Sequence, residues 1–396
     1  MAIDSNPVGS RSLPDDCLLD PRIYTDPAIF ELELDHIFSR GWLWLGVICE
    51  AQSPGQFFRN EIGGVPVIVC RAEDGKLRGF VDACGICGES IAHMQWGNGR
   101  LLQCAESHAV YDLTGTAVEG AGGSLEPIRV ENYLGFLFAA LKPTASLRDY
   151  LGVQADWWER LTVIRTDIEW ELVTAWMTPS DTNWKEFMQP GDGYHVQSLH
   201  KIFCKYMTPK AGFYDVLQHV SPRYGHIIFP YPPPNYEYFR ANLWGGVHSP
   251  EEINLPTVAR NPKGWGGWVG DTFPNVIYAV RNEWLLWLQL VMPRAVDRTM
   301  VYNKVYCRRG LSDWQKRLIQ REEDIWTYPM GLNGEDDWAN FERQHTSLRG
   351  ETLQRLVIAR YYGEDPNAAE IRVAQDAEAG YRAYFRRWRR CLEQEE

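Results

Sequence analysis

The front of the chain changes from a helical pattern to a strand pattern. Residues 21–40, PRIYTDPAIFELELDHIFSR, repeat apolar positions at helical spacing after an Asp-Pro start, which predicts an amphipathic helix. From Trp42 to about Val130 the apolar runs are short and separated by turns, and an Asp74-Gly75 pair is typical of a hairpin. We expect this part to form a small antiparallel β domain.

The pattern changes again beyond Pro143, where a polar stretch interrupts the strands. The segment from Ala368 to the C-terminus is predicted to be helical, because its composition favours a helix and it contains neither Gly nor Pro after Gly380. Before this segment we expect strands at 163–178, 213–230 and 276–307, the start of a helix at 183–200, and helices at 310–327 and 334–350. These strands and helices together predict an α+β fold in which a sheet packs on helices.

These patterns divide the chain into three expected parts. Residues 1–40 are a helical segment that packs on the larger domain, residues 41–155 form the β domain, and residues 156–396 form the α+β domain. A chain of 396 residues with 45% hydrophobic residues and 17 Trp is long enough to build two packed cores.

Charge and composition disfavour several classes of function. The net charge of −12 disfavours nucleic acid as a partner, because phosphate binding needs a basic surface. No apolar run approaches the roughly 18 residues of a membrane span, and the first residues contain no apolar leader, so neither membrane insertion nor secretion is expected. The nine cysteines are scattered and odd in number, which favours reduced thiols in a cytoplasmic protein.

Two histidines and a distant carboxylate give the strongest chemical signal. His195 and His200 lie in NWKEFMQPGDGYHVQSLH, and the carboxylate is Asp337 or Asp336 in GEDDWANFE. Two imidazoles and one carboxylate on one face of Fe(II) leave positions open for dioxygen and substrate. A lone pair of histidines is more often structural than metal-binding. Because the histidines are five positions apart, roughly 140° around a helix, the helix must distort or end for them to converge.

A second candidate metal segment is CGICGESIAHMQWGNGRLLQCAESHAVYDLTG, residues 84–115. A Rieske cluster needs two thiolates on one iron and two imidazoles on the other, in Cys-x-His and Cys-x-x-His pairs. Cys84 and Cys104 occupy the thiolate positions, but Ile86 and Ser107 occupy the histidine positions. A normal Rieske cluster is therefore not expected.

The same segment offers a different set of ligands. Cys84, Cys87, Cys104 and His108 supply three thiolates and one imidazole, at a spacing similar to that of structural zinc sites. Three states are compatible with these residues: zinc in place of the cluster, an empty site in which Cys87 is only a small apolar residue, or an atypical iron–sulfur cluster. Retention of the candidate ligands favours a bound metal, since such loops lose order without one.

These motifs together resemble the catalytic α subunits of Rieske-type aromatic-ring-hydroxylating oxygenases. That family carries Asn-Trp-Lys, then Asp-x-x-His-x4-His, then a distant Asp followed by an aromatic residue. PGQFFRNEIGGVPVIVCR and YDLTG resemble its Rieske domain, so the resemblance covers most of the chain. It implies a small antiparallel β Rieske-like domain and a catalytic domain of antiparallel sheet covered by helices, with the helix-grip, START-like fold.

The resemblance also implies roles for individual residues. His195, His200 and Asp337 match the ligands of the mononuclear Fe(II), and the spacing to Phe341 favours Asp337 over Asp336. Asp192 matches the aspartate that connects the iron of one subunit to the Rieske cluster of its neighbour in a head-to-tail trimer. Gln189 is the candidate for the polar residue near iron, although the segment before Asp192 is slightly shorter than usual. These two residues complete the implied catalytic set.

The implied function is a catalytic α subunit that has lost its own cluster. It would hydroxylate an apolar or aromatic substrate with dioxygen, as a mono- or dioxygenase. Its electrons would come from a Rieske-bearing α paralogue in a mixed trimer or hexamer, supplied in turn by a ferredoxin and a reductase. The alternatives are a structural or regulatory subunit whose partner carries out all the chemistry, and an unrelated Fe(II)-dependent reaction fed by a soluble reductant.

Overall fold

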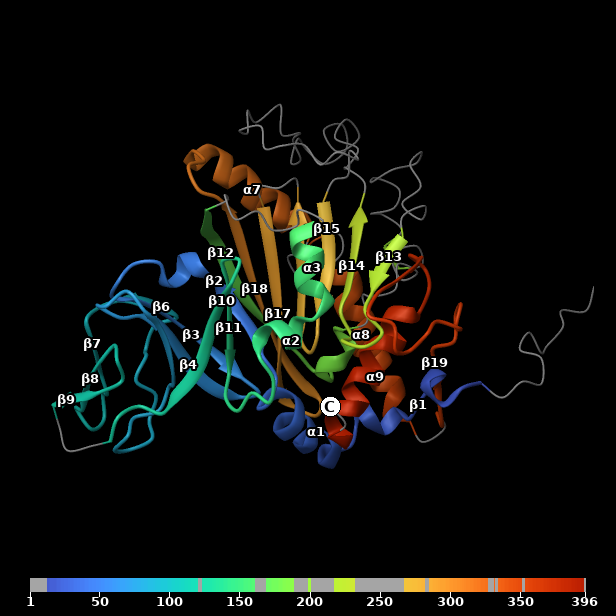
Figure 1. Cartoon of the computed structure of the whole chain (residues 1–396), viewed down its shortest axis with the longest axis horizontal. Coiled ribbons are helices and arrows are strands. Elements are labelled where there is room, and N and C mark those ends of the chain that lie inside the picture. Colours follow the sequence, from blue (N-terminus) through green and yellow to red (C-terminus); the bar gives the residue numbers. More distant parts are fainter. Residues whose placement is uncertain are drawn as a thin grey trace, which may run out of the picture.

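The structure is a computed structural model of the chain. It describes residues 13–119, 123–160, 169–188, 199–200, 217–231, 267–281, 285–326, 331, 334–350 and 353–394. Figure 1 shows a β-rich part formed by the front of the chain, beside a larger part in which helices cover a broad sheet. In the described portion, no helix combines the length and the apolar character that crossing a membrane requires.

The predicted N-terminal helix is present. α1 (Pro27–Glu33) begins with Pro27 directly after Asp26, whose carboxylate accepts a hydrogen bond from the N–H of Ala28 at 2.9 Å. The helix continues as the π-helical turn η3 (Leu34–Phe38). It is preceded by η1 (Asp15–Cys17), β1 (Leu18–Leu19) and η2 (Pro21–Tyr24).

The front half forms antiparallel sheets, as predicted. One sheet has seven strands in the order β2-β11-β10-β5-β4-β3-β6, and a small one has the order β7-β8-β9. The Asp74-Gly75 hairpin joins β4 to β5, and Gly75 has φ 76° there. The strands are β2 (Leu43–Val47), β3 (Gln56–Ile62), β4 (Val65–Arg71), β5 (Leu77–Val81), β6 (Trp96–Asn98), β7 (Leu101–Gln103), β8 (Val110–Asp112), β9 (Ala117–Glu119), β10 (Pro127–Tyr133) and β11 (Phe136–Ala140), and η4 (Ile48–Ala51) follows β2.

The larger part is an eight-stranded antiparallel sheet with helices packed on it. Its strand order is β12-β18-β17-β16-β15-β14-β13-β20. The strands are β12 (Trp170–Ser180), β13 (Leu217–Val220), β14 (Ile227–Tyr231), β15 (Gly267–Thr272), β16 (Val276–Arg281), β17 (Leu285–Ala295), β18 (Arg298–Arg308) and β20 (Ile371–Ala374). The helices are α2 (Leu147–Leu151), α3 (Val153–Arg160), η5 (Trp184–Glu186), α7 (Asp313–Trp326), α8 (Gly334–Leu348) and α9 (Ala379–Glu393), and β19 (Leu356–Val357) pairs with β1.

The prediction of a continuous helix from Ala368 was wrong. β20 forms instead, and it adds to the sheet edge by pairing with β13, with Ile371 opposite Val220. Ile371 and Val373 alternate with polar or small residues and pack on a buried cluster that contains Val220. The two-residue alternation and the available edge therefore outweighed the helical composition, and only α9 is helical.

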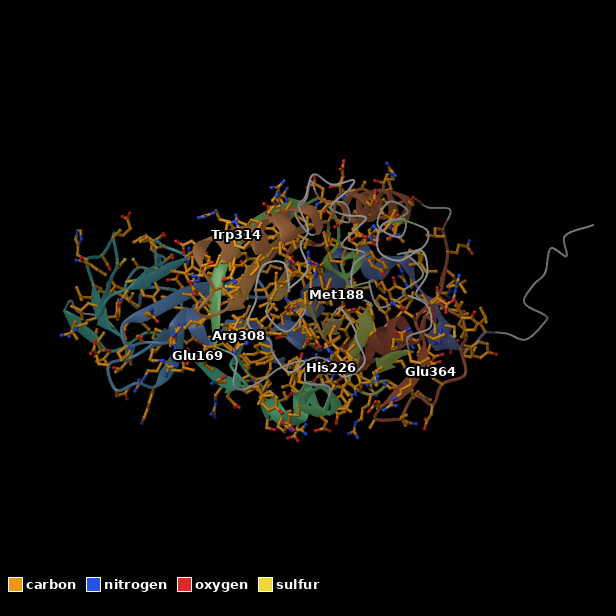
Figure 2. All side chains as sticks on the ribbon, turned by 90° about the horizontal axis from the view of Figure 1, so that it is seen from above. Glu169, Met188, His226, Arg308, Trp314 and Glu364 are labelled. Atoms are coloured by element: carbon orange, nitrogen blue, oxygen red, sulfur yellow. The ribbon has the colours of Figure 1, made fainter. Side chains whose placement is uncertain are left out.

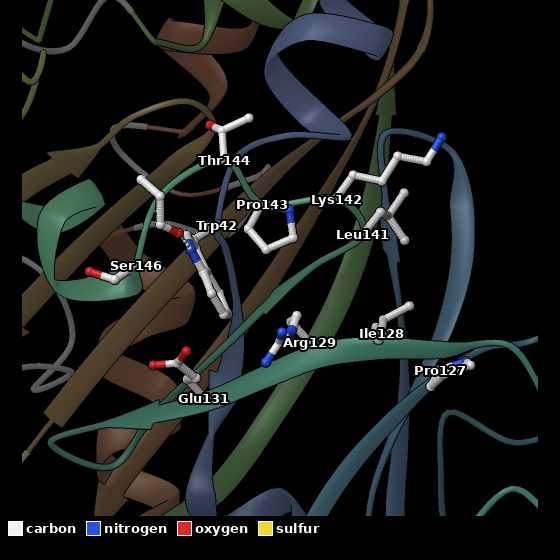
Figure 3. Close-up of a pocket in the computed structure, with 11 residues that line it drawn as sticks. Trp42, Pro127, Ile128, Arg129, Glu131, Leu141, Lys142, Pro143, Thr144 and Ser146 are labelled. Atoms are coloured by element: carbon white, nitrogen blue, oxygen red, sulfur yellow. Dashed lines mark hydrogen bonds between the residues drawn. The ribbon is translucent and has the colours of Figure 1, made fainter. Parts of the chain in front are cut away.

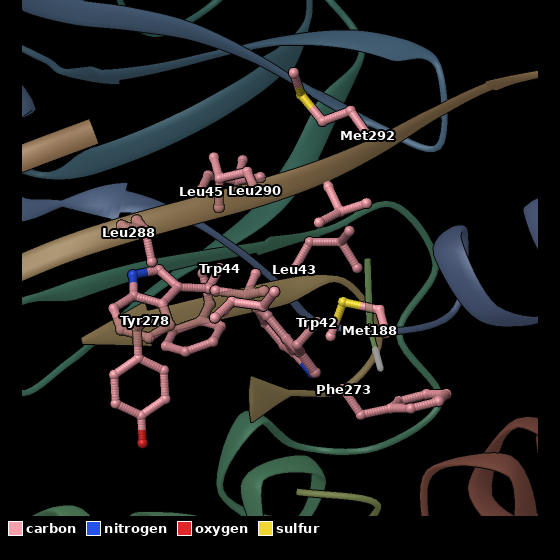
Figure 4. Close-up of a cluster of buried hydrophobic side chains, with 14 of the residues drawn as sticks. Trp42, Leu43, Trp44, Leu45, Met188, Phe273, Tyr278, Leu288, Leu290 and Met292 are labelled. Atoms are coloured by element: carbon pink, nitrogen blue, oxygen red, sulfur yellow. The ribbon is translucent and has the colours of Figure 1, made fainter. Parts of the chain in front are cut away.

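The two parts share one hydrophobic core. β2 is buried along its whole length, and the Trp44 ring stacks on Phe136 at 4.2 Å and contacts Tyr278 of the larger sheet at 5.4 Å. Figure 4 shows residues of β2 against residues of β16 and β17 within this cluster. The β-rich part is therefore held on the larger sheet by packing, not by a linker alone.

A buried ion pair also joins the two parts. The Lys304 ammonium of β18 donates to the Glu50 carboxylate at 2.7 Å, and both side chains are fully buried. Tyr306 and Trp96 also donate to Glu50, at 2.6 and 2.9 Å. Because each charge has its partners, the pair fixes the position of one part on the other.

Candidate metal centres

The start of the predicted iron-binding segment is anchored by buried polar contacts. The Asn183 side chain accepts a hydrogen bond from the N–H of Lys185 at 3.1 Å and donates to the Val296 carbonyl at 2.7 Å. The Lys185 ammonium and the Trp184 indole both donate to Glu33 of α1, at 2.6 and 2.7 Å. The Asn-Trp-Lys motif is therefore held by the N-terminal helix and by the loop after β17.

Aromatic packing brings α8 against this segment. The Phe187 ring contacts Trp338 and Phe341 edge-to-face, each at 4.9 Å between ring centroids. Met188 ends the described part of the segment, and it lies near the middle of the molecule seen from above, between Arg308 and Glu364 (Figure 2). The start of α8 thus lies beside the predicted metal-binding region.

The structure brings one predicted histidine ligand to the predicted carboxylate. His200 Nε2 lies 3.0 Å from Asp337 Oδ1, and His200 is only 2% exposed. Asp336 Oδ2 lies 3.6 Å from the other ring nitrogen, Nδ1. Neighbouring ligands of one ion, each about 2.1 Å from it, lie about 3 Å apart, so His200 and Asp337 have the spacing of two ligands.

The other predicted iron-site residues fall outside the described part of the chain. These are Gln189, Asp192 and His195. The residues that are described fit the implied iron, because an imidazole and a carboxylate are donors that non-haem Fe(II) takes.

A second buried histidine and carboxylate, which the sequence patterns did not single out, lie on α8 and η5. His345 of α8 is 2% exposed, and its Nδ1 lies 3.9 Å from Oε1 of the fully buried Glu186. Burial lowers the pKa of His345, with Arg349 adding to the effect. The available signal was helical spacing, because Asp337, Phe341 and His345 succeed one another by four residues on one face of α8.

A separate group of three thiols lies in the β-rich part. The Sγ atoms of Cys84, Cys87 and Cys104 all lie within 4.8 Å of one another, and those of Cys87 and Cys104 are 3.6 Å apart. Cys84 follows β5 and Cys104 follows β7, so two loops converge on this point. The predicted cysteine ligands are therefore brought together.

Hydroxyl groups surround the Cys84 thiol. Ser107 Oγ and Tyr111 OH lie 3.2 and 3.3 Å from Cys84 Sγ. Burial raises the pKa of Cys84, but these hydroxyls and the N–H groups of Cys87 and Ile86 outweigh it and lower the pKa to about 6. Cys84 is therefore poised to be a thiolate.

These loops do not fit a Rieske cluster. Ile86 is 45% exposed at the place of one histidine ligand and has no donor atom. Ser107 stands at the place of the other, against Cys84. His108 lies outside the group of three thiols, exposed and with φ 59°.

A cavity of about 650 Å³ lies elsewhere, between β10 and the connection at 141–146. Figure 3 shows its lining, in which the buried Trp42 donates its indole N–H to the carbonyl of Ala145 at 2.9 Å. None of the candidate metal ligands that the structure describes lines it.

The antiparallel sheet therefore lies with a buried histidine in contact with a carboxylate of α8, and these are donors that a non-haem iron takes. Residues 167–394 match the family described as ring hydroxylating alpha subunit (catalytic domain). This is more than half of the chain, so the protein belongs to the ring-hydroxylating alpha subunits.

Relatives along the sequence agree with this assignment. The chain is 28% identical to 2-aminobenzenesulfonate 2,3-dioxygenase subunit alpha from Alcaligenes sp., over 94% of this chain and 93% of that protein. It is 35% identical to biphenyl 2,3-dioxygenase subunit alpha from Rhodococcus jostii, over 45% of this chain and 42% of that one. The chain is therefore a component of a Rieske-type non-haem iron oxygenase, whose family uses a non-haem iron centre.

Solved structures share the fold. Naphthalene 1,2-dioxygenase from Rhodococcus sp. superposes with a TM-score of 0.80 at 23% identity, covering 96% of both chains. A quaternary ammonium Rieske monooxygenase superposes with a TM-score of 0.74 at 16% identity, covering 96% of this chain and 99% of that one. The predicted α+β fold, a Rieske-like β domain with a helix-grip catalytic domain, is confirmed.

Proposed function

We propose that this chain is a cluster-deficient catalytic α subunit of a heteromeric Rieske oxygenase. One contrast between its two candidate metal sites carries the proposal. His200 and Asp337 lie 3.0 Å apart in the catalytic domain, whereas Ile86 and Ser107 replace both histidines of the cluster site. The oxygen chemistry would be retained and the electron supply lost.

His195, His200 and Asp337 would hold the mononuclear Fe(II). Bound there, the iron would supply dioxygen activation beside the substrate. Burial of His200 keeps its imidazole in a fixed position and limits water at the site. Asp192 is proposed as the residue that faces the partner subunit, and Gln189 as a polar residue near the iron.

The arrangement of the chain supports electron supply from a partner. β7, β8 and β9, beside the cysteine loops, lie at one end of the molecule, whereas α8 lies well away from them in the larger part (Figure 1). A cluster there would face another subunit more readily than this chain's own iron. The solved quaternary ammonium Rieske monooxygenase is reported to reveal insights into inter-subunit electron transfer. We infer a mixed trimer or hexamer with a Rieske-bearing α paralogue, reduced in turn by a ferredoxin and a reductase.

The substrate proposed is a small apolar or aromatic compound. Curated relatives are named for 2-aminobenzenesulfonate, biphenyl and benzene, which share an aromatic ring. The proposed location is the cytoplasm, which suits the free thiols among the described cysteines. Zinc is proposed to replace the iron–sulfur cluster at the three cysteines.

The proposed domain boundaries are those expected from the sequence: 1–40, 41–155 and 156–396. Contacts of Glu33 support the first of them, because this residue of α1 accepts hydrogen bonds from Trp184 and from Trp388 of α9, each at 2.7 Å. The N-terminal segment therefore packs on elements of the catalytic domain.

The alternative proposal is a structural or regulatory α-like subunit. The missing cluster histidines support this role as much as they support the catalytic one. Coexpression with a Rieske-bearing α paralogue separates the two. His200→Ala is introduced in this chain alone, and turnover is measured with biphenyl, benzene and 2-aminobenzenesulfonate as probes. We expect product formation to fall by about tenfold or more. Unchanged product formation would overturn the catalytic role and support the structural one. His36→Ala, at a histidine of η3 that is not one of the proposed iron ligands, is the control.

A further inference from the structure

The two cysteine loops repeat one backbone pattern. In the first loop, the N–H of Cys84 donates to the carbonyl of Glu89, five residues on, at 2.8 Å, and the N–H of Gly88 donates back to the carbonyl of Cys84 at 2.9 Å. In the second loop, the N–H of Cys104 donates to the carbonyl of Ala109 at 2.9 Å, and the N–H of His108 donates back to the carbonyl of Cys104 at 3.1 Å. The loops are therefore equivalent, position by position.

This equivalence shows why His108 lies apart from the thiols. His108 is the fifth residue of its loop, as Gly88 is of the other, and both have left-handed backbones, with φ of 59° and 77°. The fifth position closes the turn, and His108 is exposed there. Its function in the loop is conformational.

The fourth position of each loop is the one that faces the partner loop. In the first loop it is Cys87, whose Sγ lies 3.6 Å from Cys104 Sγ. In the second loop it is Ser107, whose Oγ lies 3.2 Å from Cys84 Sγ. Each loop therefore presents its first and fourth side chains to the other loop.

We propose that Cys84, Cys87, Cys104 and Ser107 form a zinc site with three thiolate ligands, in which the Ser107 hydroxyl, directly or through a water, completes the fourth position. The inference rests on the proposed function only in taking the iron–sulfur cluster to be absent. Two Cys-x-x-Cys-type loops are a recurrent way to hold tetrahedral zinc, and this chain differs from that form only by a serine in one place.

Distances and charge agree with this ion. Zinc–sulfur bonds of about 2.3 Å place two sulfurs of a tetrahedron about 3.8 Å apart, close to the 3.6 Å between Cys87 and Cys104. Binding forms three Zn–S bonds and releases to solvent the protons that the thiols still carry. The bound group carries one net negative charge, and the N–H of Ile86, directed to Cys84 Sγ at 3.4 Å, helps to stabilise it.

The test uses the purified full chain, with zinc and iron measured together by mass spectrometry. We expect about one zinc ion per wild-type chain and loss of most of it in Cys104→Ser. His108→Ala is the matched control beside Ser107, and zinc release to a chelator should change less than about twofold in it. Ser107→Cys should slow that release by about tenfold or more, because it adds a fourth thiolate.

Two results would overturn the proposal. The first is that wild-type protein takes up no zinc from zinc chloride. This result also counts against the proposal when thiol titration finds a Cys87–Cys104 disulfide. The other is loss of zinc from His108→Ala as complete as from Cys104→Ser. If Cys104→Ser does not fold, wild type and Ser107→Cys are loaded with cobalt(II) instead, and their absorption spectra test the proposal. Thiolate-to-cobalt charge-transfer absorption should be stronger in Ser107→Cys than in wild type. Wild-type protein that contains iron but no zinc overturns this inference alone. Wild-type protein that contains zinc but no iron overturns only the catalytic proposal.

Discussion

His200 Nε2 and Asp337 Oδ1 lie 3.0 Å apart, although 136 residues lie between them in the sequence. The histidine is buried at the end of the Asn-Trp-Lys segment, and the aspartate is in the first turn of α8. Phe187, earlier in the same segment, packs on the α8 aromatics Trp338 and Phe341. This distance is the one expected between two ligands of the same ion.

Asp337→Asn should remove most of the iron from the protein, while Asp336→Asn should retain it. A carboxamide is a weaker ligand than a carboxylate, and Asp337 is the carboxylate nearer to a ring nitrogen of His200. The measurement is iron per chain after anaerobic loading with ferrous iron, and the expected loss is about tenfold or more. Equal iron content in the two variants, or the reverse order, would contradict the assignment of Asp337.

Restoring both histidines should allow a Rieske cluster to form. In Ile86→His/Ser107→His, the second pair of ligands returns at positions that already lie beside Cys84. After reconstitution with iron and sulfide, visible absorption and an electron paramagnetic resonance signal of a reduced [2Fe–2S] centre are expected. Each single variant is the control and should show neither signal. A colourless double variant would indicate that the loops have lost the cluster geometry as well as its ligands.

Glu33→Gln should destabilise the fold by about 3–5 kcal/mol, because it leaves the fully buried ammonium of Lys185 without its counter-charge. Trp184 and Trp388 would also lose the charged acceptor that they share. Chemical denaturation followed by tryptophan fluorescence measures the change. Glu31→Gln, exposed on the same helix, is the matched control and should shift the free energy of unfolding by less than about 0.5 kcal/mol. Similar values for the two variants would argue against the proposed importance of the buried pair.

Acid should destabilise the protein through His226. The N–H of Phe273 donates to Nδ1 at 3.1 Å and Nε2 contacts the Tyr150 carbonyl at 3.3 Å, so the imidazole is held neutral with its proton on Nε2. Complete burial lowers the pKa of His226 to about 3. The unfolded chain takes up this proton below about pH 6.5, so the stabilisation is fully present above that pH and is lost as the pH falls towards 3.

The expected slope reaches about 1.4 kcal/mol per pH unit within this window. Urea denaturation of wild type and His226→Asn at pH values between 7 and 4.5 measures it. The variant is less stable at pH 7, but its dependence on pH should be flatter. Parallel slopes for the two proteins would show that another group controls the acid sensitivity.

The sequence by itself determined the local structure and the kinds of donor atoms. Hydrophobic spacing predicted α1, the front strands, α7 and α8, because burial of a periodic face depends mainly on nearby residues. The residue types alone also showed that Ile86 cannot ligate iron and that an imidazole and a carboxylate were available for Fe(II). Composition misjudged β20, where an open sheet edge decided the outcome.

Only the tertiary structure decided which side chains meet. Sequence spacing favoured His108 as the fourth zinc ligand, whereas the loops turn Ser107 towards Cys84 because the fifth position takes a left-handed backbone. The role of Glu33 had no sequence signal, since its partners come from segments far along the chain. Contacts of this kind depend on how whole elements pack, and local propensities do not encode them.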